Sequence, residues 1–312
     1  MFRLFGTLYV ATTAAVALRP TNIFKGRHHM SQKRQQTLIK SFNVSRQSPP
    51  TQWECSACTF LNDVALNSCE MCDATSSRKK AKKEKQTHPF AEELNKKLQG
   101  DLFYLTDDAA SWVIHKRKFK LPPSSNDFDS AWSSHPSSYH KLKVFGREVS
   151  ENRYSQHWSS KHGEGYSYSG TRSVALCYKD GEIPGARAVE ELTSCCNELT
   201  AGAGGGGERY NACLQNWYEQ QHTIGLHADD ERQMDPEMPI FSLSWGGTRR
   251  FLLRPKEKPT GEGVREFFLE SGSLLVMGGT CQKTHKHEVP KFRKTKDPPT
   301  SRRINWTVRA FL

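Results

Sequence analysis

The segment Arg303-Ile-Asn-Trp-Thr-Val-Arg309 alternates polar and apolar residues without a break. Successive side chains of a β-strand point to opposite faces, so Arg303, Asn305, Thr307 and Arg309 would share one face while apolar residues line the other. Two guanidinium groups in one pocket require a dianion, because arginine pairs with carboxylates through two parallel hydrogen bonds. The segment therefore predicts a strand with a core face and an anion-binding face.

A group of metal-ligand residue types precedes this segment. His227 and Asp229 are one residue apart, which would place both side chains on one face of a strand. His287 follows the strand-like stretch 272–277 and offers a second imidazole, and His285 could be the ligand instead. Two imidazoles and a carboxylate form the facial triad that binds iron and leaves positions open. An HxD pair is common by chance, so the prediction depends on the later motifs as well.

Short strand-like segments dominate the C-terminal two thirds of the chain. Helical periodicity is confined to residues 90–98 and 187–199. The strand-like segments are residues 141–145, 239–244, 249–253, 267–269, 273–277 and 303–311. Many short strands with Gly/Pro turns predict a jelly roll with flanking helices over residues 89–312, and hence an α+β fold class.

The order HxD, then His, then RxNxTxR closely resembles the AlkB family of oxidative demethylases over most of residues 100–312. The resemblance implies a double-stranded β-helix that binds iron(II) through His227, Asp229 and His287. It also implies that the co-substrate 2-oxoglutarate is bound by Asn216, Tyr218, Arg303, Asn305, Thr307 and Arg309. The expected reaction oxidises the methyl group of an alkylated base, such as 1-methyladenine or 3-methylcytosine, and releases formaldehyde.

Further segments resemble the eukaryotic homologue that acts on double-stranded DNA. Residues 144–146 would form a hairpin wedge that fills the gap left by a flipped base, with a buried strand end as the alternative. Asp230 and Glu231 would favour a cationic methylated base, with a solvated acidic turn as the alternative. The predicted substrate contacts are Val144, Phe145, Gly146, Arg153, Tyr166, Ser167, Tyr168, Asp230 and Glu231.

Two CxxC pairs lie upstream of the predicted catalytic domain. Their spacing is that of two tight turns whose four thiolates close a tetrahedral zinc site. The cysteines are Cys55, Cys58, Cys69 and Cys72. Residues 51–74 resemble the zinc finger of the RanBP2 and Npl4 type. The other five cysteines have no metal-ligand spacing, and their odd number argues against a secreted disulfide framework.

The predicted zinc finger carries a candidate partner surface. Thr59-Phe60 and Met71 resemble the pattern with which fingers of this family bind ubiquitin. RNA-binding fingers carry arginines and stacking side chains on this face, and this sequence does not. Ubiquitin is therefore the expected partner, and a purely structural finger is the alternative.

Residues 1–50 contain several basic residues and neither Asp nor Glu. Such a start is typical of an organelle transit peptide, and a secretory signal is the less favoured alternative. Translation from Met30 would give a nuclear form beside a mitochondrial one. Gln36–Phe42 resembles the short peptide that docks on the replication sliding clamp, with a chance pattern in a disordered arm as the alternative. Residues 75–88 are rich in lysine and predict a solvated basic linker.

The charge balance restricts the partners. The chain has 45 Lys+Arg against 33 Asp+Glu, a formal net charge of +12, which favours a polyanion. DNA, preferably double-stranded, is the expected partner, and RNA or single strands are the alternative for the same chemistry. A second alternative is a ubiquitin and clamp adaptor with an inactive dioxygenase fold. No membrane partner is expected, because the apolar stretch 4–18 is short for a span of about 20 residues.

Overall fold

The computed structural model describes residues 52–76, 86–144, 146–168, 171–202, 208–257, 261–298 and 301–312, with the backbone alone at residues 144, 165–168 and 171–173. The chain divides into two units, residues 1–81 and 82–312. Several sequence predictions fall outside the described residues: the targeting and disordered arm in residues 1–50, the clamp peptide, most of the basic linker, and Phe145.

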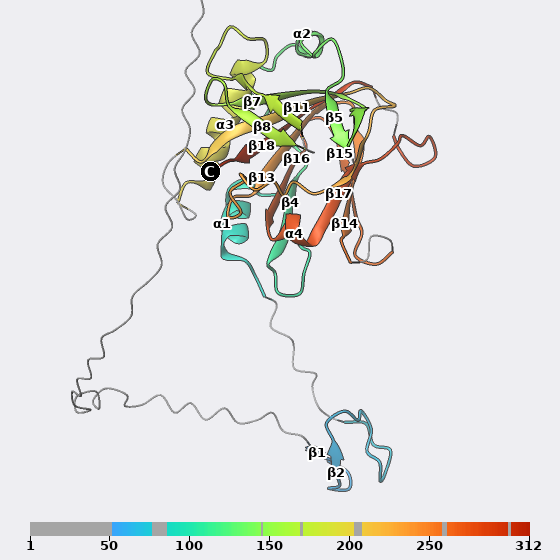
Figure 1. The fold of residues 1–312 in the computed structure, drawn as a ribbon. Helices are drawn as coiled ribbons and strands as arrows, with labels where there is room; N and C mark the ends of the chain where they lie inside the picture. The colour runs from blue at the N-terminus through green and yellow to red at the C-terminus, as the bar shows by residue number, and fades with distance from the viewer. Residues whose placement is uncertain are drawn as a thin grey trace, which may run out of the picture. The chain divides into compact units, whose positions relative to one another are not determined.

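The described part of the first unit, residues 52–76, is small and built mostly of loops (Figure 1). Strand β1 (Gln52–Glu54) pairs with β2 (Leu61–Asp63) in an antiparallel hairpin. Trp53 packs against two buried cysteines, and its Nε1 donates to the carbonyl oxygen of Leu66 at 3.1 Å. So small a core cannot hold a fold by itself, so this unit needs another stabilising element.

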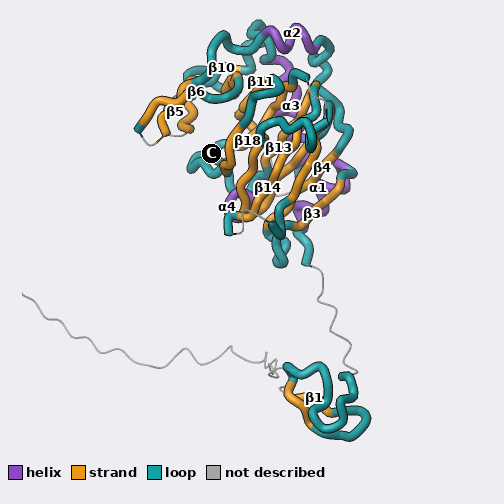
Figure 2. The backbone as a smooth tube through the Cα atoms, turned by 90° about the vertical axis from the view of Figure 1, so that its right-hand side faces the viewer, coloured by secondary structure: helices purple, strands orange, loops and turns teal. Residues whose placement is uncertain are grey.

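The second unit contains an eight-stranded sheet (Figure 2). In spatial order its strands are β10 (Leu176–Cys177), β7 (Tyr154–Ser159), β11 (Tyr210–Tyr218), β18 (Arg303–Ala310), β13 (Ile240–Gly246), β16 (Leu274–Gly279), β4 (Ser111–Lys116) and β3 (Asp101–Tyr104). The pairing is antiparallel throughout, except that β10 runs parallel to β7.

A four-stranded antiparallel sheet packs against the large one. Its spatial order is β12 (Ile224–His227), β17 (His285–Val289), β14 (Arg249–Pro255) and β15 (Arg265–Leu269). One hydrophobic cluster combines buried residues of both sheets, including Tyr218 and Leu275 of the large sheet and Phe251 and Leu253 of the small one. Two sheets that share a core in this way form the expected jelly roll, so the predicted α+β fold class is confirmed.

Two hairpins extend from this framework. Strand β5 (Lys141–Val144) pairs with β6 (Arg147–Ser150), and β8 (Gly165–Tyr168) pairs with β9 (Thr171–Val174). Gly146 lies in the turn of the first hairpin with φ of +77°, a conformation that glycine adopts without strain.

Helices cover the other face of the large sheet. They are α1 (Pro89–Leu98), α2 (Phe128–Ser133) and α3 (Ala186–Thr200), whereas the short α4 (Cys281–Thr284) contributes Cys281 to the cluster between the two sheets. Leu94 of α1 and Leu192 of α3 belong to the same buried cluster as Trp306 of β18. The periodic segments 90–98 and 187–199 are therefore confirmed as helices. The described helices include none that is long and apolar enough to cross a membrane.

The alternation along β18 separates the two faces of the large sheet. Ile304, Trp306 and Val308 lie in the helix-covered cluster. Their polar neighbours project from the opposite face, toward the small sheet, and all of β18 is buried. The predicted pattern is therefore confirmed, and it places both arginines of the motif between the two sheets.

Candidate active site

Two histidines and an aspartate meet between the sheets. His227 ends β12 and lies in register with His287 of β17. Asp229 lies two residues beyond the strand, so the prediction that it shares a strand face with His227 is wrong. Its Oδ1 is 3.6 Å from His227 Nε2, its Oδ2 is 4.0 Å from His287 Nε2, and ligand atoms of all three residues lie within 4.8 Å of one another.

The alternative ligand His285 is placed elsewhere. It is buried and pairs in register with Pro255, and its Nδ1 is 2.8 Å from Thr284 Oγ1. Among the described residues the metal-ligand group contains His287 and not His285.

The protonation states suit a metal cation. The carbonyl oxygen of Gly225 lies 2.8 Å from His227 Nδ1, so Nδ1 donates and Nε2 keeps its lone pair. Burial lowers the pKa of His227, and it lowers the pKa of His287 to about 3. Burial acts to raise the pKa of Asp229, but Arg309 and the two imidazoles outweigh it and lower this pKa to about 2. The site thus offers two neutral imidazoles and a carboxylate, a donor set that fits iron(II).

One cavity brings the triad together with the predicted co-substrate residues. Leu214, Ile224, Phe251, Met277 and Val289 supply its apolar lining. The residues predicted to bind 2-oxoglutarate all line it: Asn216, Tyr218, Arg303, Asn305, Thr307 and Arg309.

Arg303 is the clearest sign that this cavity receives an anion. The residue is 1% exposed, its Nη2 donates to Ser244 Oγ at 2.9 Å, and its guanidinium lies over the Tyr218 ring at 5.1 Å. Burial lowers its pKa to about 10, so it stays charged at neutral pH. Its Nε and Nη1 have no hydrogen-bond partner among the described residues. A buried cation with unpaired donors is costly, and a carboxylate of 2-oxoglutarate would satisfy them.

Asn305 and Thr307 are engaged with the protein. Asn305 Nδ2 donates to Ser242 Oγ at 3.0 Å and to the carbonyl oxygen of Leu243 at 2.9 Å. Thr307 Oγ1 donates to Asn305 Oδ1 at 3.2 Å. The two bonds from Asn305 tie β18 to β13, and the bond from Thr307 holds the Asn305 amide in place on the face where the arginines lie.

The predicted substrate residues occupy several places. Tyr166, Ser167 and Tyr168 lie on β8, and Val144 and Gly146 flank the tip of the first hairpin. Asp230 is exposed and 3.5 Å from Lys256 Nζ, whereas Glu231 is half-buried. Arg153 is only 4% exposed and bonds to Glu151 and Asn216. The structure therefore places Arg153 beside the co-substrate residues and not at the protein surface.

Some residues of the site were missed by sequence analysis. Ser242 and Ser244 support Asn305 and Arg303, and their alternation within the predicted strand 239–244 was a usable signal. Gln282 Oε1 accepts from the backbone N–H of Asp229 at 3.0 Å and helps to hold the carboxylate. No sequence pattern pointed to Gln282, because it lies in a short helix that periodicity does not reveal.

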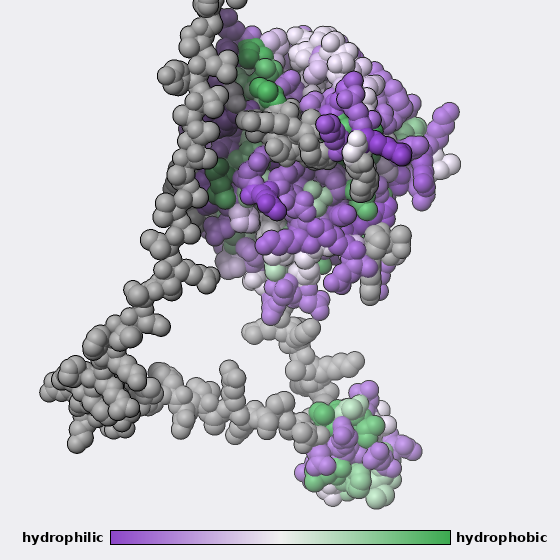
Figure 3. All heavy atoms as spheres, viewed as in Figure 1, coloured by the Kyte–Doolittle hydropathy of each residue, from purple (hydrophilic) through white to green (hydrophobic). Residues whose placement is uncertain are grey.

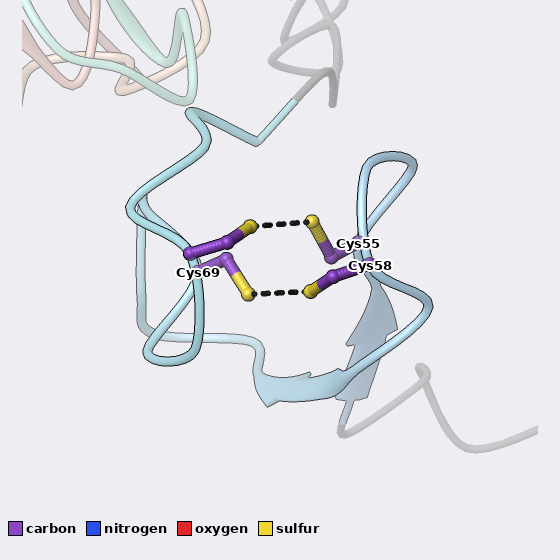
Figure 4. Close-up of side chains that lie close together, drawn as sticks. Cys55, Cys58 and Cys69 are labelled. Atoms are coloured by element: carbon purple, nitrogen blue, oxygen red, sulfur yellow. Dashed lines mark hydrogen bonds between the residues drawn. The ribbon is translucent and has the colours of Figure 1, made fainter.

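The first unit gathers four sulfur atoms in one place (Figure 4). Cys55 Sγ and Cys72 Sγ are 3.6 Å apart, Cys58 Sγ and Cys69 Sγ are 3.5 Å apart, and all four lie within 4.8 Å. The backbone amides of Ala57 and Met71 lie 3.4 Å from the sulfurs of Cys55 and Cys69, an arrangement that stabilises thiolates. All four cysteines are free, and together they fit one zinc ion.

Apolar side chains remain on the surface of this unit (Figure 3). Phe60 is 37% exposed and Met71 is 67% exposed, and Leu61 and Val64 are exposed as well. The buried Asn62 connects the cysteine turns, because its Nδ2 donates to the carbonyl oxygen of Phe60 and its Oδ1 accepts from the amide of Glu70.

Comparison with known proteins gives the family of the second unit. The model of the 2OG-Fe(II) oxygenase superfamily matches residues 114–309. The chain therefore belongs to this superfamily, whose members use iron(II) and 2-oxoglutarate, and the predicted cofactors are confirmed at this level.

Several of the curated relatives are AlkB homologues. The chain is 32% identical over 179 residues to DNA oxidative demethylase ALKBH2 of Mus musculus, covering 55% of this chain and 67% of that one. It is 28% identical over 192 residues to ALKBH2 of Arabidopsis thaliana, covering 55% and 57%. It is 34% identical over 110 residues to alpha-ketoglutarate-dependent dioxygenase alkB homolog 3 of Rattus norvegicus, where the match spans 33% of this chain and only 36% of the relative. The predicted AlkB relationship is confirmed.

Proposed function

We propose that this protein is an iron(II)- and 2-oxoglutarate-dependent dioxygenase that removes methyl groups from alkylated bases in DNA. The observation that carries the proposal is the single cavity that holds the His227, Asp229 and His287 ligands beside the unpaired donors of Arg303. A metal triad alone is compatible with many reactions, but a buried cation next to it fits the dicarboxylate co-substrate.

Different residues of the site would have different roles in this reaction. Bound iron and 2-oxoglutarate supply the oxidising chemistry with dioxygen. His227, Asp229 and His287 would hold the metal, and Arg303 would orient the co-substrate. Arg309, whose Nη2 is 2.8 Å from Asp229 Oδ1, keeps that carboxylate ionised and fixed. The apolar wall around Phe251 limits access of water to this site.

DNA is the substrate that the remaining observations favour. Two relatives, from Mus musculus and Arabidopsis thaliana, are DNA oxidative demethylases by name, and the net charge of +12 suits a polyanion. Asp230 and Glu231 follow the metal ligands directly, and their charge would favour cationic bases such as 1-methyladenine and 3-methylcytosine. The second candidate, action on RNA or single strands, uses the same site and differs in the role of the β5–β6 hairpin.

The variant Phe145→Ala separates these two candidates. Loss of a wedge side chain removes what fills the gap beside a flipped base, so demethylation of duplex DNA should fall about tenfold or more, while single-stranded activity stays within about twofold. Formaldehyde release from matched duplex and single-stranded oligonucleotides with one 1-methyladenine measures this. Val149→Ala, an exposed apolar residue on β6 of the same hairpin, should leave both rates unchanged. A preference for single strands, with no effect of Phe145→Ala on either substrate, would favour the single-strand or RNA candidate.

We also propose that the zinc finger binds ubiquitin through Thr59, Phe60 and Met71. The exposed Phe60 and Met71 side chains support this, because both need an apolar partner surface to become buried. Met71→Ala should weaken binding of ¹⁵N-labelled ubiquitin at least about fivefold in an NMR titration, whereas Val174→Ala on the second unit should not change it. Binding that survives Met71→Ala unchanged would contradict the proposal. A nuclear protein with a mitochondrial form, and clamp binding through Gln36–Phe42, remain predictions from sequence.

A further inference from the structure

A buried ion pair connects the end of the β5–β6 hairpin with the wall of the cavity. Glu151 directly follows β6 and is 6% exposed. Its Oε1 accepts from Arg153 Nη2 at 3.1 Å, and its Oε2 accepts from Ser155 Oγ at 2.5 Å. Arg153 is itself 4% exposed. Two opposite charges buried together hold each other strongly, because either one left alone would be an unpaired charge out of water.

The same arginine fixes the orientation of the Asn216 side-chain amide. Arg153 Nε donates to Asn216 Oδ1 at 2.7 Å. A guanidinium has donors and no acceptor, so the amide of Asn216 can present only its oxygen to Arg153. Asn216 lines the cavity, and no described residue accepts a hydrogen bond from its Nδ2. One N–H donor of the cavity wall is thus left for the ligand.

The alternative orientation of this amide would oppose the proposed co-substrate. An asparagine amide can rotate by 180°, which exchanges its oxygen and its nitrogen. With the amide reversed, the carbonyl oxygen of Asn216 would take the place of the donor and would repel a carboxylate. Arg153 prevents this reversal, and Glu151 keeps Arg153 in place.

We infer that Glu151 and Arg153 are positioning residues that fix the Asn216 amide so that it offers an N–H group to a carboxylate of 2-oxoglutarate. The inference rests on the proposed function, because it concerns the same co-substrate. Glu151 thereby acts on co-substrate affinity through two intervening side chains, without touching the ligand.

The affinity for 2-oxoglutarate tests this without any turnover. Isothermal titration calorimetry of the full chain loaded with manganese(II) would compare wild type with Glu151→Gln and Arg153→Met. Each variant should bind 2-oxoglutarate about tenfold more weakly, as expected for the loss of one hydrogen bond to a charged group. Manganese affinity should not change. Glu148→Gln is the matched control, because Glu148 lies on β6 in an exposed ion pair with Lys141. This variant should bind 2-oxoglutarate as tightly as the wild type.

A double-mutant cycle separates positioning from a general structural effect. In an Asn216→Ala background, Glu151→Gln should have no further effect on 2-oxoglutarate affinity, because the side chain that it positions is gone. Losses that add up in the double variant would overturn the inference, and so would normal affinity in a folded Arg153→Met protein. If Arg153→Met does not fold, Glu151→Gln decides alone, since it removes the charge that holds Arg153 and keeps the size and shape of the side chain. Failure of the wild type to bind 2-oxoglutarate would instead reject the proposed function.

Discussion

Replacement of Asp229 with alanine is expected to abolish demethylation, with a loss of turnover on the order of a thousandfold or more, equivalent to about 4 kcal/mol of barrier. The carboxylate is the anionic member of a ligand set whose other members are neutral imidazoles. Its removal also takes a paired carboxylate away from Arg309, whose Nη2 lies 2.8 Å from Asp229 Oδ1, and the uncompensated positive charge would then repel the metal. Iron binding and catalysis should therefore fail together.

Iron content and formaldehyde release measure this effect. Asp101→Ala is a suitable control, because Asp101 is an exposed aspartate on β3 in a loose ion pair with Arg117. The control should keep its iron and its activity. An Asp229→Ala protein that retained a tenth of the wild-type turnover would contradict the assignment of this residue as a metal ligand.

Removal of zinc should unfold the first unit and leave the second intact. A structural zinc ion contributes on the order of 10 to 16 kcal/mol to small fingers, far more than the core around Trp53 provides. A zinc chelator, or the variant Cys58→Ser, should therefore collapse the NMR amide dispersion of residues 52–76. The thermal unfolding of the second unit should not change, because its core is separate from that of the finger.

Cys195→Ser is the matched control for the finger. Cys195 lies on α3, has no metal-ligand spacing and is half-buried. This variant should keep a folded finger and its zinc. A finger that stayed ordered without zinc would show that the four cysteines are not a structural metal site.

The sequence predicted the parts of the site that one strand carries. The alternation in Arg303–Arg309 gave the correct face for each residue, because a strand with one apolar and one polar face has a period of two. By contrast, polar and apolar residues do not alternate along β11, whose sequence is YNACLQNWY, so no pattern assigns its residues to a face. Asn216 and Tyr218, which it carries, could be identified only through the family resemblance.

Contacts between segments that are far apart in the chain could not be predicted from the sequence. The choice of His287 over His285 depends on the register of β17 with β12, which nothing in the local sequence fixes. The bond between Arg153 and Asn216 joins residues 63 positions apart, so Arg153 was predicted as a substrate contact and its buried setting was not foreseen. Asp229 was assigned to a strand because spacing does not reveal where β12 ends.

The central claim is best tested by turnover of a duplex oligonucleotide with a single 1-methyladenine, supplied with iron(II), 2-oxoglutarate and oxygen. We expect formaldehyde, succinate and repaired adenine in equal amounts, and none of them when 2-oxoglutarate is omitted. Conversion of 2-oxoglutarate without repair of any methylated DNA or RNA strand would contradict a nucleic-acid demethylase, and absence of 2-oxoglutarate conversion by iron-loaded protein would contradict a dioxygenase altogether.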